Sequence, residues 1–437
     1  MRTMKRVAAV ALSVVVLMTS GVSAKAAVTD VQPAKSSSEA VLKWAKKVGE
    51  PFDEKTYANN TVSKIKLVGN YLYVADDAKH RIMKIDKKDG TILKEQKYCD
   101  ESYIQGYVSS IGYGDGKVYV GYDNGRVQAF DENTLESLWI TDENKNAINS
   151  DFVFTNGKLY FGTTAKTTDW YDNGAPFSYY VVTTSDDDKT KPDEEKTMKK
   201  VVESKTGKFY LKKGVVLGKY IVISDTAGTL TMIDTTNDKV TDTKDIGEAF
   251  SGNITYDEMT GTIYFVAGTN DLYGIKVSAD GKLKDEKKVR LYETGYSSTT
   301  PEVYNGKVYV SGSKGKAFQD KGYMAVADVS SDKYKVNYTV ELSNYSQCEP
   351  TIVKTGENSV RVYFTINDEP GGIYAIEDSK DATSATLETV YEPTGDIKNT
   401  GCMSDVVVDE DGTIYFANDS KYIMSVGKKV EDTKKSD

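Results

Sequence analysis

The sequence predicts an all-β protein, an eight-bladed β-propeller of four-stranded antiparallel blades. One phrase returns along the chain: a turn with Gly or Asn, then a strand with Tyr near its start. The clearest copies are 115–121, 156–162 and 305–311. From Tyr73 to Tyr415 seven steps average about 49 residues, a period typical of propellers. The eight copies place these residues at the same point: Tyr73, Tyr119, Tyr160, Ile221, Tyr264, Tyr309, Tyr363 and Tyr415.

The chain begins with features of a secretion signal. Basic residues up to Arg6 precede an apolar run over 7–18 and small residues, so we expect cleavage near Ala24 to Ala26. Residues 1–26 are therefore excluded from the fold, and the polar stretch 27–39 is expected to be a flexible leader. The sequence predicts a secreted protein, extracellular or associated with the cell surface, with no membrane span.

Composition narrows the chemistry. The formal net charge is −9, and an acidic chain repels phosphate backbones, which argues against a nucleic-acid partner. The one histidine, His80, lies in a polar turn, which weakens every mechanism that depends on imidazole. We expect a monomer that binds a protein, a glycan or another small ligand.

The second repeat shows the plan of a blade. Its strands are expected over 108–112, 117–122, 126–130 and 136–141, because β-branched and aromatic runs there alternate with turns that contain Gly. The same plan predicts one propeller domain over 40–428. The charged stretch 429–437 is expected to be disordered.

The last repeat lacks a fourth strand. Its three strands, 405–408, 413–417 and 422–426, would leave an unpaired edge. The alternating segment 40–48 around Trp44 has no other place in the repeats, so we expect it to complete this blade and close the ring.

The third repeat carries an insertion over 163–207. A hairpin of 179–184 and 198–203 is expected there, joined by a charged loop. The run 186–188, three aspartates, lacks the alternating oxygen ligands and turn Gly of a calcium loop, so a solvated tip is expected and no metal site.

Aromatic residues also gather in this insertion. Trp170, Tyr171 and Phe177 are candidates for stacking on a sugar ring or anchoring a protein partner. The alternative is that they form a local cap over the third blade.

The third turn and outer strand carry a recognisable motif. The segment 129–139 runs from Ala129 through Asp131 and Thr134 to Trp139, and it resembles the repeat of pyrroloquinoline-quinone-like β-propellers, with Leu135 in place of the usual Gly. Partial copies contain Asp86 and Asp234, and Trp44 resembles the closing Trp of the last blade. We expect the Asp to accept hydrogen bonds from its own turn and the Trp to pack between blades.

This resemblance implies two classes of function. The family holds quinone-dependent dehydrogenases and also non-catalytic propellers used for assembly, sensing or surface binding. A dehydrogenase would need a Ca²⁺ site of carboxylate and amide oxygens, a catalytic Asp and usually adjacent cysteines, yet the sequence has no Cys-Cys pair. We therefore expect a non-enzymatic binding scaffold without cofactor. The alternatives are a dehydrogenase with pyrroloquinoline quinone and Ca²⁺, or a purely structural surface protein.

Small polar residues recur where the inner strands begin. They are expected to form a ring at the channel mouth; alternatively, they hydrogen-bond neighbouring inner strands or simply fit the crowded axis. These residues are Ser63, Ser109, Ser150, Thr299, Cys348 and Cys402. Beside them, Glu349 and Asp405 are candidate ligands for a cation or a sugar hydroxyl. A disulfide between Cys348 and Cys402 is expected if their Cα atoms lie within about 7 Å. Cys99 is expected to stay free.

Overall fold

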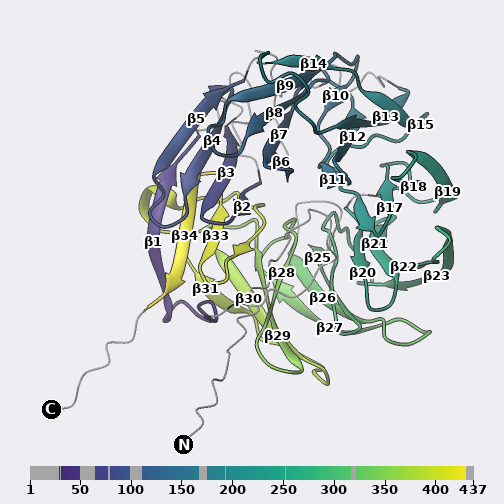
Figure 1. Cartoon of the computed structure of the whole chain (residues 1–437). Helices are drawn as coiled ribbons and strands as arrows, with labels where there is room; N and C mark the ends of the chain where they lie inside the picture. Colours follow the sequence, from purple (N-terminus) through teal and green to yellow (C-terminus); the bar gives the residue numbers. More distant parts are fainter. Residues whose placement is uncertain are drawn as a thin grey trace, which may run out of the picture.

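The computed structural model contains eight antiparallel sheets arranged in a ring around a central axis (Figure 1). It describes residues 29, 31–49, 64–76, 79–98, 111–166, 175–191, 193–250, 252–315 and 321–429. The predicted eight-bladed propeller is confirmed. The predicted signal peptide lies outside the described residues, as do Ser63, Cys99, Ser109, Trp170, Tyr171 and 430–437.

Blades 1 to 3 follow one another along the chain. Blade 1 contains β2 (Lys66–Val68), β3 (Tyr71–Asp76), β4 (Arg81–Asp86) and β5 (Ile92–Lys97). Blade 2 contains β6 (Ile111–Gly114), β7 (Lys117–Gly121), β8 (Val127–Asp131) and β9 (Ser137–Thr141), with β14 (Glu194–Lys196) added outside β9. Blade 3 contains β10 (Ala147–Ile148) and β11 (Val153–Thr155), which both pair with β12 (Lys158–Thr164), then β13 (Phe177–Thr183) and β15 (Lys199–Ser204).

Blades 4 to 6 are regular four-stranded sheets. Blade 4 contains β16 (Val215–Leu217), β17 (Tyr220–Ser224), β18 (Thr229–Asp234) and β19 (Lys239–Asp245). Blade 5 contains β20 (Thr255–Asp257), β21 (Thr262–Ala267), β22 (Asp271–Val277) and β23 (Leu283–Arg290). Blade 6 contains β24 (Glu302–Tyr304), β25 (Lys307–Ser313), β26 (Gly322–Asp328) and β27 (Lys335–Leu342).

The last two blades complete the ring. Blade 7 contains β28 (Thr351–Lys354), β29 (Ser359–Thr365), β30 (Ile373–Ser379) and β31 (Glu388–Tyr391), followed by a 3₁₀ turn, η3 (Gly395–Ile397). Blade 8 contains β32 (Val407–Val408), β33 (Ile414–Ala417), β34 (Tyr422–Lys428) and, on its outer edge, β1 (Ala40–Lys47). Strand β1 pairs antiparallel with β34 from Ala40–Lys428 to Lys47–Tyr422, so the predicted closure by the N-terminal strand is confirmed (Figure 1).

The hairpin turns have the backbone that their residues favour. Asn156 and Gly157 have φ of 52° and 67°, and Asn305 and Gly306 have 49° and 74°. Two consecutive positive φ values give the turn that matches the twist of paired strands, which is why Asn-Gly between two strands predicts a hairpin. These turns set the register in which Thr155 pairs with Lys158.

The core is divided into layers between neighbouring blades. One layer joins Tyr119 and Trp139 of blade 2 to Phe152, Leu159 and Phe161 of blade 3. The closing layer joins Leu72, Val74, Met83 and Ile85 of blade 1 to Tyr415 and Ile423 of blade 8. Each blade therefore buries both faces, and the ring needs no separate cap.

In five blades the tyrosine of the repeat hydrogen-bonds across the seam to the next blade, whereas Tyr119 donates to Gly114 O of its own blade. Tyr73 Oη donates to Glu132 O at 2.7 Å, and Tyr415 Oη donates to Lys87 O at 3.2 Å. Both acceptors lie just after the third strand of the following blade. Tyr160, Tyr309 and Tyr363 make corresponding bonds to Asp238, Asp378 and Ala34. The Tyr that marks the period thus fastens the seams, a role that its position in the repeat did not reveal.

The motif residues act structurally. Asp131 Oδ1 accepts hydrogen bonds from the backbone N–H groups of Asn133 and Thr134, at 2.8 and 2.9 Å. Asp86 and Asp234 make the same kind of bond to Lys88 and Thr236. Trp139 is fully buried and donates from Nε1 to Thr184 O of blade 3 at 3.3 Å, while Trp44 donates to Lys87 O of blade 1 at 3.1 Å.

The Leu135 substitution has a packing reason. In blade 1 the turn has Gly90 at φ 74°, where a Cβ would lie 2.7 Å from the ring of Trp44. Blade 2 has Leu135 at φ 58°, fully buried against the side of blade 1, whose outer strand has no Trp. Leu135 therefore fills the space that a Trp would occupy.

Part of the expected leader is packed. Ala34 is 1% exposed and its carbonyl accepts from Tyr363 Oη, while Lys35 O accepts from Arg361 Nη1 at 3.0 Å. Within the leader expected over 27–39, Ala34 and the carbonyl of Lys35 therefore pack against blade 7.

Candidate functional site

Charged side chains from several blades meet on the ring axis. The first strands β2, β6, β11, β20 and β28 lie nearest the centre (Figure 1). Just before the first strand of six blades, or at its first residue, stand seven residues that we call the axial cluster: Lys64, Lys66, Asp151, Lys213, Glu302, Glu349 and Asp405. Five of them precede their first strand by two residues, so the repeat itself places them alike.

Two ion pairs define the geometry. Lys64 Nζ lies 3.0 Å from Asp405 Oδ2, between blades 1 and 8. Lys213 Nζ of blade 4 lies 3.7 Å from Glu349 Oε1 of blade 7, so these side chains meet across the axis. The side chains of Lys64 and Lys213 stay 39% and 40% exposed, because they point into open space although protein surrounds them.

The carboxylates are also linked to one another. The backbone N of Glu349 donates to Asp405 Oδ1 at 2.7 Å. Burial raises the pKa of Glu302 well above its usual value, and the charge of Glu349 and a hydrogen bond to it raise it further. Burial alone would raise the pKa of Glu349, but the charges of Lys213 and Lys64 lower it. Of the two carboxyl groups, Glu302 therefore binds a proton more readily than Glu349 does.

Lys66 differs from the other lysines of the cluster. Within the described part of the chain, no carboxylate lies within ion-pair distance of its ammonium group. Burial lowers the pKa of Lys66 to about 8, with repulsion from Lys213 and Lys64 adding to the effect and attraction to Asp151 opposing it. By contrast, burial would lower the pKa of Lys64, but the charges of Asp405, Asp151 and Glu349 raise it.

The four described members of the expected mouth ring are buried. Ser150 Oγ accepts from Gly162 N at 2.8 Å, and Thr299 Oγ1 donates to Ser311 O at 2.9 Å. Cys348 and Cys402 are fully buried, and their thiols contact Thr365 and Ala417 on the second strands of their own blades. These contacts go to the second strand of the same blade and not to a neighbouring inner strand, and the four side chains are buried rather than open at a channel mouth.

The expected disulfide is wrong. Cys348 and Cys402 are both free thiols in the structure. Cys348 Sγ accepts from Thr365 N at 3.2 Å, so it bonds within blade 7 and does not reach toward the next blade. Burial raises the pKa of both thiols, which keeps them protonated.

In several blades, the small residue expected in the channel-mouth ring lies one residue before the side chain that faces the axis. Lys64, Asp151 and Glu349 each follow a small residue of the expected ring. Successive side chains of an extended segment point to opposite sides, so the small residue turns inward and its neighbour faces the axis. Glu349 and Asp405 were recognised from the sequence; Lys64, Lys66, Asp151, Lys213 and Glu302 were missed. Counting back from each first strand would have found five of the seven.

The insertion does not offer Phe177 as a surface contact. Phe177 is the first residue of β13 and is 1% exposed, so it belongs to the core between blades 3 and 4. The predicted hairpin corresponds to β13 and β15. The loop between them was expected to be a solvated tip, yet it returns to blade 2, where β14 pairs parallel with β9.

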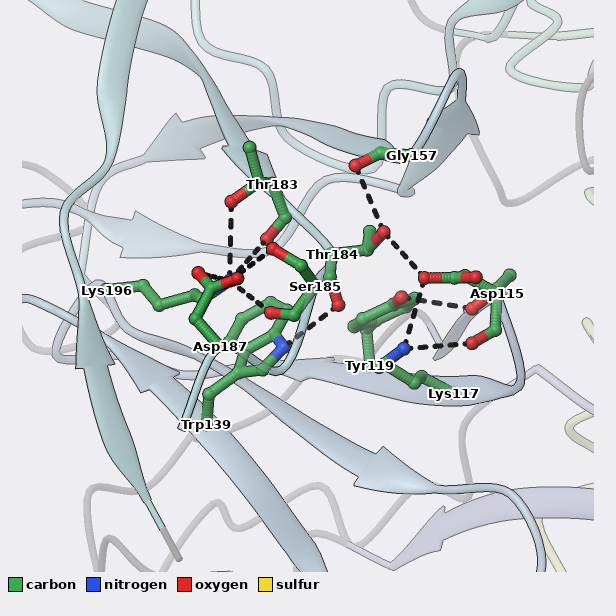
Figure 2. A network of polar contacts seen from close by, with 11 residues as sticks. Asp115, Lys117, Tyr119, Trp139, Gly157, Thr183, Thr184, Ser185, Asp187 and Lys196 are labelled. Carbon is green, nitrogen blue, oxygen red and sulfur yellow. Dashed lines mark hydrogen bonds and ion pairs between the residues drawn. The ribbon is translucent and has the colours of Figure 1, made fainter. Parts of the chain in front are cut away.

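A buried lysine anchors this loop (Figure 2). Lys196 is 7% exposed, and its Nζ donates to Thr183 O at 3.2 Å, to Ser185 O, and to the carboxylate of Asp187 at 3.3 Å. The same ammonium lies 5.4 Å from the ring centre of Trp139. The aspartates of the loop are therefore used inside the loop, since Asp188 also accepts from Thr190 N and pairs with Lys191.

The axial cluster does not fit a calcium–quinone site. Lysines already pair with Asp405 and Glu349, and burial disfavours the charged form of Glu302 by raising its pKa. Within the described ranges, no three His, Cys, Asp or Glu side chains are grouped so that they could hold a metal ion. The two described cysteines are separate and buried, so no adjacent pair is present there to face a quinone ring.

Known structures share this fold. The structure is similar to that of BamB from Moraxella catarrhalis, with 12% identity and a TM-score of 0.59 over 89% of this chain and 99% of BamB. It is also similar to quinohemoprotein alcohol dehydrogenase from Comamonas testosteroni, with 10% identity and a TM-score of 0.63 over 89% of this chain and 76% of the enzyme. No family model matches the sequence, and no curated protein sequence matches it. At these identities the likeness establishes the fold alone. The described residues include no helix that could cross a membrane.

Proposed function

We propose that this protein is a secreted, non-enzymatic propeller that binds a protein partner or a small ligand at the axial cluster. The observation that carries the proposal is the pairing of Lys213 with Glu349 across the axis, beside the pair of Lys64 and Asp405. The charged groups of these pairs are partly exposed. Both carboxylates are already paired with lysines and are therefore not free to bind Ca²⁺. These pairs suit polar recognition better than metal-assisted oxidation.

The rest of the ring supports a binding role. Blades fastened at their seams by buried tyrosines change little in shape, and a rigid scaffold presents its loops and axial groups at low entropic cost. The secretion signal predicted at the start of the chain would place this surface outside the cell. The structural likeness to BamB and to a quinohemoprotein alcohol dehydrogenase is compatible with either class, so the proposal of a binding role rests on the chemistry of the axis.

A thermal-shift series on the mature protein tests the proposal. We expect stabilisation by a glycan, a peptide or an extract from the cell surface, because a ligand at a hundred times its dissociation constant adds about 2.7 kcal/mol to the native state. Pyrroloquinoline quinone with Ca²⁺ should cause no shift. A shift with quinone and Ca²⁺ alone, followed by alcohol oxidation, would establish the dehydrogenase alternative instead.

A further inference from the structure

We propose that the axial cluster binds an anionic group, a carboxylate or a phosphate, through the ammonium group of Lys66, next to Lys213. This inference rests on the proposed binding function and names the chemistry that the site recognises. The anion can belong to a free small molecule or to the carboxyl terminus or an acidic side chain of a partner protein.

Position in the repeat is the first argument. Lys64 and Lys66 are two residues apart at the start of β2, so in an extended strand their side chains point to the same side, toward the axis. The other described first strands begin with Ile111, Val153, Val215, Thr255, Glu302, Thr351 and Val407. Among these described first strands, β2 is therefore the one that begins with a cation, Lys66.

Charge balance is the second argument. Lys64 is neutralised by Asp405 at 3.0 Å, and Lys213 has Glu349 at 3.7 Å. Four charged groups act on Lys66, in decreasing order of effect Lys213, Asp151, Lys64 and Glu349, so two cations and two carboxylates surround it. Among the described residues Lys66 has no ion pair of its own, and the charge that affects it most is the ammonium group of Lys213, so a bound anion would relieve this repulsion. Its intermediate exposure leaves room for such a ligand.

Protonation supports the same conclusion. Burial and the neighbouring lysines lower the pKa of Lys66 to about 8, so the ammonium form predominates at pH 7 and is lost above pH 8. An anion binds the charged form and would raise this pKa. Anion affinity should therefore fall as the pH rises from 7 to 9.

Competitive acetylation of lysines, followed by mass spectrometry, tests the proposal on the folded mature protein. Only the neutral amine reacts, so Lys66 should become reactive with a midpoint near pH 8. Inorganic phosphate, succinate and a short peptide with a free carboxyl terminus serve as probes, and the same peptide with an amidated terminus serves as the control. We expect the anionic probes to protect Lys66 at pH 8 and the amidated peptide to fail. Lys94, on the outer strand β5 of the same blade, serves as the exposed reference lysine.

Affinity measurements complete the test. By titration calorimetry, Lys66→Met should weaken binding of the protective probe at least about tenfold, as expected for a lost charge-assisted hydrogen bond, whereas Lys94→Met should leave it unchanged. Protection by phosphate and succinate points to a free small ligand, and protection by the peptide alone points to a partner's terminus. Absence of protection by every anion, or equal affinity in Lys66→Met, would overturn the anion site. The proposed binding function would then stand or fall separately on the thermal shifts with glycans, uncharged peptides and extracts.

Discussion

Two ion pairs of equal length behave differently in this ring. Lys64 and Asp405 meet at 3.0 Å on the axis, and Lys307 and Asp378 meet at 3.0 Å in the seam between blades 6 and 7. The axial side chains are 39% and 23% exposed, whereas those of the seam are 9% and 1% exposed. Asp378 also accepts from Tyr309 at 2.8 Å and from Tyr338 at 2.5 Å.

This difference in exposure distinguishes a structural ion pair from one that a ligand can reach. In the seam, every oxygen of Asp378 has a fixed donor from the neighbouring blade, so the pair holds two blades together and has nothing left to bind. On the axis, water reaches both partners, and a ligand can exchange with it. The same chemical pair is thus structural where it is closed and open to recognition where it is solvated.

The largest effect is expected at the buried seam. Lys307→Met leaves the Asp378 carboxylate buried without its cation, and breaking such a pair costs about 3–5 kcal/mol. Urea unfolding followed by tyrosine fluorescence measures this loss. Lys335→Met, in which the replaced lysine is 66% exposed, serves as the control and should change stability by less than about 0.5 kcal/mol. A loss below about 1 kcal/mol for Lys307→Met would show that the seam is not closed.

A second seam sharpens the comparison. Lys158 and Tyr160 contact Asp238 of blade 4, each at 2.7 Å, with the same Asn-Gly-Lys-x-Tyr pattern. Asp238 is 10% exposed and keeps Lys199 at 2.9 Å, so Lys158→Met should cost about 1–2 kcal/mol, less than Lys307→Met. The same unfolding measurement ranks the two variants. The reverse order would mean that burial does not decide the strength of these pairs.

A pH series probes the axis itself. Because the folded-state pKa of Glu302 is raised, native protein binds more protons than unfolded protein above pH 4.5, and this contribution to stability is lost as the pH rises. Glu302→Gln removes the titration, so wild type should lose stability relative to the variant with rising pH, by at most about 1.4 kcal/mol per pH unit. Unfolding curves from pH 4 to 8 give this difference. Parallel pH profiles would contradict the raised pKa of Glu302.

The smallest effect on stability is expected for the axial pair. Lys64→Met removes a solvent-screened interaction, so we expect a loss of about 0.2–1 kcal/mol. The variant should nevertheless change ligand binding, since Asp405 would lose its counter-charge. Unfolding and calorimetry on the same preparation separate these effects. A loss of several kcal/mol would assign the axial pair to the framework.

The period and turn chemistry predicted the fold, because Asn-Gly turns and alternating strands are local properties that each repeat carries by itself. The partner of a side chain across a seam depends on two repeats at once, which is why the tyrosine bonds and the packing of Leu135 were not predicted. The ring position was displaced by one residue for the same reason: a small residue and its charged neighbour are adjacent in sequence, and only the strand bounds decide which one faces the axis. Strand β14 pairs through three polar residues, Glu194, Glu195 and Lys196, which carry no strand signal.

A pair of double-mutant cycles tests the central claim most directly. Stability is measured for Lys307→Met, Asp378→Asn and their combination, and likewise for Lys64→Met, Asp405→Asn and their combination. We predict a coupling energy of about 2–3 kcal/mol in the seam and below about 1 kcal/mol on the axis. Equal coupling energies, or a larger one on the axis, would contradict the division between a closed framework and an open recognition site.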